Sequence, residues 1–288
     1  MISRAHITAW RAHAPWSTDV QVEQDLIISR AIVEVFSDPL LSDSLAFRGG
    51  TALHKLYLAP PARYSEDIDL VQVQSGPIGS IITALRQRLD SWLGAPKRKQ
   101  SEGRMTMIYR FDSEIPPITP LRLKVEVNTR EHFSVIGFAR KPFSVASPWF
   151  RGSVELLTYE LEELLATKLR ALYQRSKGRD LCDLAAALDH IPQLDLQKVV
   201  DCFLRYLEQE GHRVSRAEFE ANMAGKMDDP VFHGDVEPLI VPGAFQDDAF
   251  GSRAFQTGTV SYDPAAAYRR VHQAFIARLP GDAWKGLK

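Results

Sequence analysis

The sequence predicts an α+β protein, in which an N-terminal half combines helices with a sheet and a mainly helical C-terminal half follows. Stretches 105–111 and 121–127 alternate apolar and polar residues, as half-buried strands do. Beyond about residue 150, apolar residues recur at helical spacing instead. The 288 residues, 45% of them hydrophobic, suffice for two ordinary domains, which we place at 1–150 and 151–288.

The elements of the first half follow from local patterns. Residues up to 45 are predicted to be helical, with a capping-box pattern at Thr18 and Gln21 and a stop at Ser37-Asp38-Pro39. The other predicted elements are a short strand at 45–48, a helix at 51–57, a strand at 68–73, a helix at 78–93, strands at 105–111 and 121–127, and one or two strands within 133–145.

In the second half, two closely spaced helices are predicted between residues 157 and 188, a third at 196–207 and a last at 264–278. Residues 227–255 lack periodicity and contain three prolines, which is typical of a long ordered loop or arm.

The composition excludes several classes of protein. No stretch approaches the ~18 consecutive apolar residues of a membrane helix, and the N-terminus has no apolar signal-peptide core. Cys182 and Cys202 are too few for a zinc site and are typical of a reducing cytoplasm. A cytoplasmic protein that does not bind a membrane is therefore predicted.

The central motif joins a glycine pair to two carboxylates. Gly49 and Gly50 separate a strand from a helix that starts at Thr51, and N–H groups at a helix start bind phosphate oxygens. Asp67 and Asp69 share one face of the next strand. Close carboxylates repel each other unless a cation lies between them, and Mg²⁺ prefers such oxygen ligands. A Mg²⁺ site beside a phosphate site is predicted; the alternative is a strand edge that merely carries two acids.

Glu126 is the candidate third metal ligand. It shares a strand face with Lys124 and Asn128. If this strand lies beside that of Asp67 and Asp69, three acids converge, enough for two metal ions. The alternative is an exposed strand face, on which Lys124 is only the ion-pair partner of Glu126.

These motifs resemble those of polymerase-β-type nucleotidyltransferases and, more narrowly, the AbiEii/AbiGii toxin family, which includes the MenT toxins of mycobacteria. Three blocks carry the resemblance: Gly-Gly-Thr-Ala-Leu at 49–53, Arg-x-Ser-x-Asp-Ile-Asp-Leu at 63–70, and a helical block from Lys168 to Leu184. The last block contains Lys168, Ala171 and Arg175, then Arg179-Asp180-x-x-Asp183-Leu184.

The resemblance implies a polymerase-β-like domain with a mixed sheet, whose active-site cleft the helical domain completes. It also implies a role for each matching residue. By this resemblance, Asp67 and Asp69 bind Mg²⁺, and Gly49, Gly50 and Thr51 bind the triphosphate. Lys168 contacts the nucleotide phosphates, and Asp183 completes the catalytic set. Ser65 and Arg179 lie at the nucleotide. Ser65 resembles a residue that is phosphorylated in some silenced relatives; the alternative is a loop hydroxyl bonded to local backbone.

Lys168 and Asp183 also have explanations outside catalysis. Lys168 lies in an apolar helical stripe, so it must extend to solvent, pair with an acid or point into a cleft. Asp183 is expected on the face opposite the leucines of its helix, beside Arg179, and either a polar cleft facing the first domain or plain solvent would account for that position. A surface ion pair between these two would contribute only ~0.3–0.5 kcal/mol.

By resemblance, the protein is a Mg²⁺-dependent transferase that moves a nucleoside monophosphate from an NTP, with CTP as the candidate, to the 3′ end of tRNA. Blocking that end would stop translation, as expected of a toxin in a toxin–antitoxin or phage-defence system, and a cognate antitoxin would be its partner. The alternatives are transfer to a protein or a small molecule, and a non-catalytic nucleotide-binding module.

Basic residues crowd into one part of the sequence, although 35 Lys plus Arg nearly balance 36 Asp plus Glu overall. They are Arg86, Arg88, Lys97, Arg98, Lys99, Arg104 and Arg110, followed by Arg122, Lys124 and Arg130. Such a local excess is typical of surfaces that follow phosphates, and we expect the tRNA acceptor stem here. A solvated face is the alternative.

Overall fold

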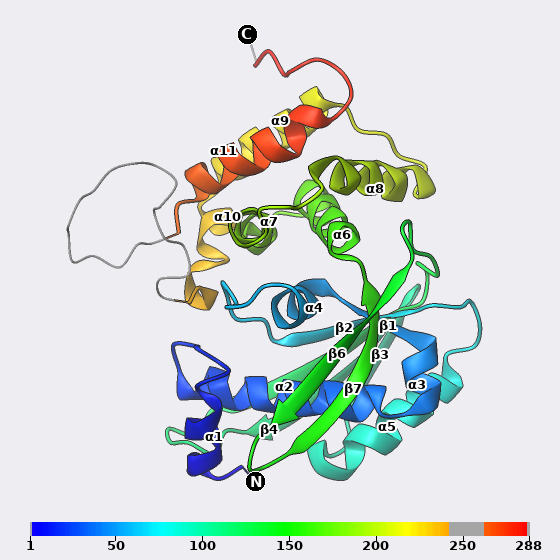
Figure 1. Cartoon of the computed structure of the whole chain (residues 1–288), viewed down its shortest axis with the longest axis vertical. Coiled ribbons are helices and arrows are strands. Elements are labelled where there is room, and N and C mark those ends of the chain that lie inside the picture. The colour runs from blue at the N-terminus through cyan, green and yellow to red at the C-terminus, as the bar shows by residue number, and fades with distance from the viewer. Residues whose placement is uncertain (1, 242–261, 287–288) are drawn as a thin grey trace, which may run out of the picture. The chain divides into compact units, whose positions relative to one another are not determined.

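The computed structural model, drawn in Figure 1, describes residues 2–241 and 262–286. Two compact units result: Met1–Tyr57 with Tyr64–Tyr159, and Leu58–Arg63 with Glu160–Lys288. The chain thus passes into the second unit after Tyr159. The boundary expected from the sequence was near residue 150. Within the described residues, no helix is both long and apolar enough to span a membrane.

A seven-stranded mixed sheet is the centre of the first unit, and it confirms the predicted α+β class. Its strands are β1 (Leu45–Arg48), β2 (Asp67–Gln72), β3 (Lys97–Ser101), β4 (Arg104–Asp112), β5 (Pro120–Asn128), β6 (Phe138–Ala146) and β7 (Arg151–Tyr159). In the spatial order β3-β4-β5-β2-β1-β7-β6, β2 pairs antiparallel with β1 and parallel with β5. Because β2 is central, each of its side chains is flanked by side chains of β1 and β5 on the same face of the sheet.

One face of this sheet is apolar and the other is polar. Ile68, Met107, Leu123 and Val125 are fully buried on the apolar face, and burying each side chain contributes about 1.5–3 kcal/mol. The polar face carries the residues between them, Asp67 and Asp69 among others. The two-residue period of the strands therefore produces a hydrophobic core and a functional surface from the same sequence.

The helices of the first unit are α1 (Arg4–Trp10), α2 (Asp19–Phe36), α3 (Pro39–Ser44), α4 (Gly49–Leu56) and α5 (Gly79–Leu93). The predicted capping box of α2 is confirmed: the Gln21 N–H donates to Thr18 Oγ1 at 3.2 Å, and the Thr18 N–H donates to Gln21 Oε1 at 3.3 Å. In Figure 1, α2 and α5 lie along one side of the sheet, whereas α4 lies beside β1 and β2 on the other. The start of α4 consequently adjoins the polar face.

Two strands differ from the sequence prediction. β3 was not predicted, because it is an edge strand exposed on both faces and has no apolar alternation. β7 was not predicted either, and Leu157, predicted to be helical, lies within it. The end of β7 is buried, so its apolar residues run into those of the next helix and hide the boundary.

The second unit is helical, as predicted. It contains α6 (Leu161–Gln174), α7 (Gly178–His190), α8 (Leu196–Gln209), α9 (Arg216–Met227), α10 (Pro230–Gly234), η1 (Glu237–Leu239), α11 (Pro264–Ala274) and η2 (Ile276–Arg278). The sequence analysis missed α9, whose start has a capping box at Ser215 and Glu218. It was also wrong in treating all of 227–241 as a loop, since α10 and η1 lie there; residues 242–255 of that predicted arm lie outside the described residues.

Both cysteines are buried and free. Burial raises the pKa of the Cys202 thiol to about 12 and raises that of Cys182 as well. Neither thiol therefore forms the thiolate that a nucleophile requires near neutral pH.

Candidate functional site

The turn from β1 into α4 is built on Gly49. Its φ of +81° is a left-handed conformation that side chains with a Cβ rarely adopt. A Cβ at this position would lie 2.2 Å from Asp69 Oδ2, well inside contact distance. Glycine thus permits both the turn and the close approach of the Asp69 carboxylate to the backbone.

The first turn of α4 presents backbone N–H groups without a side-chain cap. Arg48 is the N-cap residue, and its side chain makes no capping hydrogen bond. The N–H groups of Gly49, Gly50 and Thr51 begin the helix, where no intrahelical acceptor precedes them. An anion is stabilised at such an end by these donors and by the helix dipole. The predicted phosphate site would lie at this uncapped helix start.

The Thr51 hydroxyl has a structural role. It donates to the backbone oxygen of Asp67 at 2.5 Å, and it lies 2.9 Å from Ser65 Oγ. Because the proton of Thr51 is used on Asp67, Ser65 donates to Thr51 Oγ1. The Thr51 side chain is buried, so it fastens the segment before β2 to α4 and leaves its backbone N–H as the group able to meet a phosphate.

Asp67 and Asp69 lie on one face of β2, half-buried beside each other. Burial raises the pKa of the Asp67 carboxyl above its ordinary value, although the nearby Lys124 opposes the shift. Burial and the charge of Asp67 likewise raise the pKa of Asp69. Both carboxylates are therefore ionised at an energetic cost, which a bound cation would reduce.

The predicted strand pairing that brings Glu126 to these acids is present. β2 and β5 run parallel, with Asp69 opposite Glu126 and Asp67 opposite Lys124. Lys124 Nζ lies 3.3 Å from Asp67 Oδ2 and 3.1 Å from Glu126 Oε2. Arg104 Nε also contacts Glu126, at 3.1 Å. Glu126 is thus held by two cations, as the alternative explanation for Lys124 required, while it also lies beside Asp69.

Oxygen donors of this kind fit a hard divalent cation. The Lys124 ammonium already occupies the position of a cation between Asp67 and Glu126. In residues 2–241 and 262–286, no three His, Cys, Asp or Glu side chains are grouped so that they could hold one metal ion. Asp67 and Asp69 are therefore the better-placed pair of ligands, and Glu126 can join them only after it separates from Lys124.

Arg48 is a residue of this site that the sequence analysis did not select. It lies opposite Asp69 on β1 and forms an ion pair with Glu131. Burial works to lower its pKa, but the charge and hydrogen bond of Glu131, together with Tyr159 and Asp69, outweigh burial and raise it. Asp69 therefore lies between a permanently charged arginine on β1 and Glu126 on β5.

In the second unit, Lys168 and Asp183 belong to a buried ion-pair network. Lys168 Nζ lies 2.8 Å from Asp183 Oδ2 and 3.2 Å from Asp180 Oδ1. Arg63 donates to both oxygens of Asp183, at 2.6 and 2.7 Å, and Arg175 holds Asp180 in the same way. Asp180 and Asp183 are fully buried. The acid partner that the sequence analysis allowed for Lys168 is therefore present.

Two features of α7 exclude a solvent-exposed polar face. Asp183 is not exposed: it lies away from the leucines of its helix, but α7 packs against both α6 and α11, so that side is buried as well. Arg179 does not pair with Asp183 either; its Nε lies 3.4 Å from Asp235 Oδ2. Helical-wheel reasoning treats a charged residue opposite an apolar stripe as exposed, and it could not anticipate an arginine 120 residues away that neutralises it.

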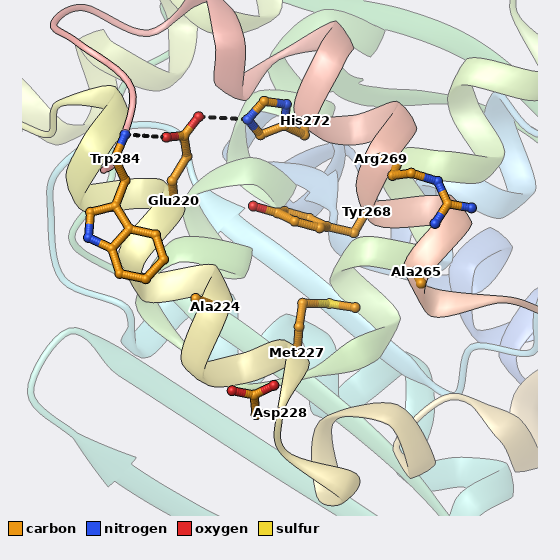
Figure 2. Close-up of a pocket in the computed structure, with 9 residues that line it drawn as sticks. All are labelled: Glu220, Ala224, Met227, Asp228, Ala265, Tyr268, Arg269, His272 and Trp284. Carbon is orange, nitrogen blue, oxygen red and sulfur yellow. Dashed lines mark hydrogen bonds and ion pairs between the residues drawn. The ribbon is translucent and has the colours of Figure 1, made fainter. Parts of the chain in front are cut away.

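A pocket of about 580 Å³ also lies within the second unit, and none of its lining residues is a predicted site residue (Figure 2). Its lining includes Met227 and Asp228 at the end of α9, and Tyr268 on α11. Glu220, on its wall, accepts hydrogen bonds from the Trp284 N–H and from His272 Nε2, each at 2.6 Å. These bonds link the C-terminal segment to α9 and α11.

Gly49→Ala is expected to lower the free energy of unfolding by about 1–3 kcal/mol, because alanine must adopt a positive φ. It is also expected to reduce catalysis, since the new methyl group displaces the Asp69 carboxylate. Thermal unfolding and initial rates of nucleotide transfer measure the two effects. Gly79→Ala is the matched control, because nothing lies within 4 Å of its Cβ position; an equal loss in the control would refute the argument.

Comparison with known proteins identifies the family and the fold. The family model described as "Nucleotidyl transferase AbiEii toxin, Type IV TA system" matches residues 30–249. The fold is similar to that of MenT4, a nucleotidyltransferase toxin from Mycobacterium tuberculosis H37Rv, with a TM-score of 0.60 and 16% identity over 98% of this chain and 92% of that one. JHP933 from Helicobacter pylori matches with a TM-score of 0.45 and 17% identity over 77% of this chain and 87% of its own. No curated protein sequence matches significantly.

Proposed function

The chain belongs to the AbiEii family of nucleotidyltransferase toxins of type IV toxin–antitoxin systems, and on this premise we propose that it modifies an RNA. The reaction is transfer of a nucleoside monophosphate from an NTP, with CTP as the candidate, to the 3′ end of a tRNA. The observation that carries the proposal is the contact of Asp69 with the Gly49 turn, which joins paired carboxylates to an uncapped helix start.

In this proposal the triphosphate binds at the first turn of α4. The N–H groups of Gly49, Gly50 and Thr51 donate to its oxygens, and glycine allows close approach. Ser65 adjoins the same turn through Thr51, so a phosphoryl group on Ser65 would place negative charge beside the triphosphate and oppose its binding. We also propose that Lys168 contacts the nucleotide phosphates, that Arg179 lies at the nucleotide, and that Asp183, the ion-pair partner of Lys168, completes the catalytic set.

Asp67 and Asp69 are the proposed Mg²⁺ ligands, with Glu126 as the third acid. Bound Mg²⁺, as one or two ions, would activate the acceptor hydroxyl and stabilise the charge that develops on the α-phosphate. Lys124 has to leave Asp67 for that carboxylate to be available, and it has to leave Glu126 before Glu126 can join as the third acid. Asp69 and Glu126 are then the acids nearest the attacking hydroxyl.

Loss of a free tRNA 3′ end would stop aminoacylation and hence growth, which accounts for toxicity. We propose a cytoplasmic site of action and a cognate antitoxin as partner. Induced expression in a bacterial host is expected to arrest growth in the wild type and not in Asp67→Asn. Normal growth with soluble wild-type protein would contradict this part of the proposal.

The chemistry is tested with purified protein, total tRNA, Mg²⁺ and each α-³²P-labelled NTP in turn. Label is expected to enter the tRNA with the wild type and not with Asp67→Asn, and the NTP that works identifies the donor. Label in no RNA, from protein that still binds NTP, would instead favour a protein or small-molecule acceptor, or a nucleotide-binding module without catalysis.

A further inference from the structure

The sheet register places an edge lysine pair on the same face as the proposed catalytic acids. Lys97 of β3 lies opposite Ile108, which lies opposite Lys124 and then Asp67. The next row on this face runs from Lys99 through Thr106 and Glu126 to Asp69. Residues opposite one another across a sheet share a face. Lys97 and Lys99 thus extend the polar face to the edge of the sheet, three strands from the acids.

The distance and the intervening side chains suit an extended polyanion. Neighbouring strands are ~4.8 Å apart, so β3 lies about 14 Å from β2. Ile108 and Thr106, which occupy β4 between the lysines and β5, carry no charge, and Thr106 is almost fully buried. A strand of nucleic acid whose end lies at Asp67 and Asp69 can therefore cross β5 and β4 and place phosphates at the β3 lysines.

Two arginines lie on the same face as Lys97 and Lys99 and add to its positive charge. Arg110 on β4 lies directly opposite Arg122 on β5. Like charges in this arrangement are destabilising unless an anion neutralises them. Arg122 has only a long contact with Glu66, 3.6 Å between Nη2 and Oε1, and its side chain remains 61% exposed. An anion between Arg110 and Arg122 would relieve this repulsion.

The cations at the edge are also available to a ligand. Lys97, Lys99 and Arg110 are exposed. Apart from residues 242–261, which are not described, no acidic side chain forms an ion pair with any of them. Edge lysines can also serve simply to prevent strands of other molecules from pairing with the sheet. Protection of the edge requires charge on β3 but on no particular face, whereas RNA binding requires positive charge on the face of Asp67 and Asp69. The two explanations can therefore be separated by experiment.

We propose that Lys97, Lys99, Arg110 and Arg122 form the track for the phosphodiester backbone of the acceptor RNA's single-stranded 3′ segment. The proposal rests on the transferase function above and specifies where its RNA lies. The track begins at Asp67 and Asp69, where the 3′ hydroxyl reacts, and ends at the exposed edge of β3. The track restricts the basic region of the sequence to one face of the sheet. Arg98 is excluded because it lies opposite the buried Met107, on the other face.

The test compares two double variants with the same change in charge. Lys97→Glu with Lys99→Glu changes the track, whereas Arg86→Glu with Arg98→Glu changes α5 and the opposite face of β3. The track variant keeps charges on the edge, so edge protection persists. Circular dichroism and thermal unfolding establish that both variants fold like the wild type.

RNA binding is measured without transfer, by fluorescence anisotropy of a fluorescein-labelled single-stranded RNA of about 12 nucleotides at several KCl concentrations. We expect the track variant to bind at least 10-fold more weakly and to lose about 1.4 from the slope of log K against log salt, two phosphate contacts at ~0.7 each. The control is expected to bind like the wild type. Equal losses in both variants, no loss in the track variant, or no binding by the wild type at low salt would overturn the proposal.

The same three proteins are then assayed for transfer to tRNA, with Asp67→Asn as the inactive reference. A wild type that binds RNA through the track but transfers no label contradicts the proposed function and leaves the track intact. A track variant that transfers label as well as the wild type contradicts the track and leaves the function intact.

Discussion

Asp69→Asn is expected to abolish nucleotide transfer and, at the same time, to stabilise the protein. Asp69 lies between Glu126 and Arg48 and against the Gly49 turn, so an amide there removes a charged ligand from the centre of the site. We expect a fall in kcat of about 10³-fold or more, because stabilisation of the transition-state charge depends on this position. Initial rates with labelled NTP and tRNA measure it.

The gain in stability follows from the direction of the pKa shift. Burial and the charge of Asp67 raise the pKa of Asp69 above its value in the unfolded chain. The folded state therefore binds more protons, and the free energy of unfolding falls as pH rises through the raised pKa. Asparagine cannot ionise and escapes this loss. The free energy of unfolding of Asp69→Asn is expected to be about 0.5–2 kcal/mol higher than that of the wild type near neutral pH, as is common when an unfavourable functional residue is replaced.

Thermal unfolding in EDTA at several pH values measures this second effect. The advantage of Asp69→Asn over the wild type should be largest near neutral pH and should shrink as acid protonates Asp69 in the wild type. Asp112→Asn is the control, since Asp112 is an exposed carboxylate on the same sheet. A variant that keeps its activity would remove Asp69 from the site, and a variant less stable than the wild type would contradict the electrostatic account.

Local signals explain why much of the first unit was predictable. The alternation in β4 and β5 is visible because one face is buried and the other polar, and the Thr18 capping box lies within four residues. The Gly49-Gly50 pair and the Asp67–Asp69 spacing likewise depend only on chain neighbours. Each of these predictions uses information from a single element.

Register and long-range pairing were not predictable in the same way. The alternative explanations for Glu126 could be weighed only once β5 was known to lie beside β2, which places Lys124 between two acids. Arg63 stands in a recognised motif, yet its partner Asp183 is 120 residues away. A helical wheel contains no information about such distant partners, so it could not show that the side of α7 opposite its leucines, which carries Asp183, is buried too.

Asp183→Ala is expected to destabilise the second unit by about 3–5 kcal/mol, because it leaves Arg63 and Lys168 buried without their shared carboxylate. Lys168→Met should cost much less. Its long side chain is replaced by one of similar shape, Arg63 still holds Asp183 through two hydrogen bonds, and Arg175 still holds Asp180. The midpoint of urea unfolding of the full chain measures both changes.

These two variants separate a structural from a catalytic role for the network. If Lys168 contacts nucleotide phosphates, Lys168→Met should remain folded and raise the KM for NTP or lower kcat, whereas a purely structural lysine would leave the kinetics of the folded variant unchanged. Asp189→Ala is the control on α7, because Asp189 forms a partly exposed ion pair with Arg270 and should contribute less than about 1 kcal/mol. Asp183→Ala no more destabilising than this control would mean that the buried network does not stabilise the fold.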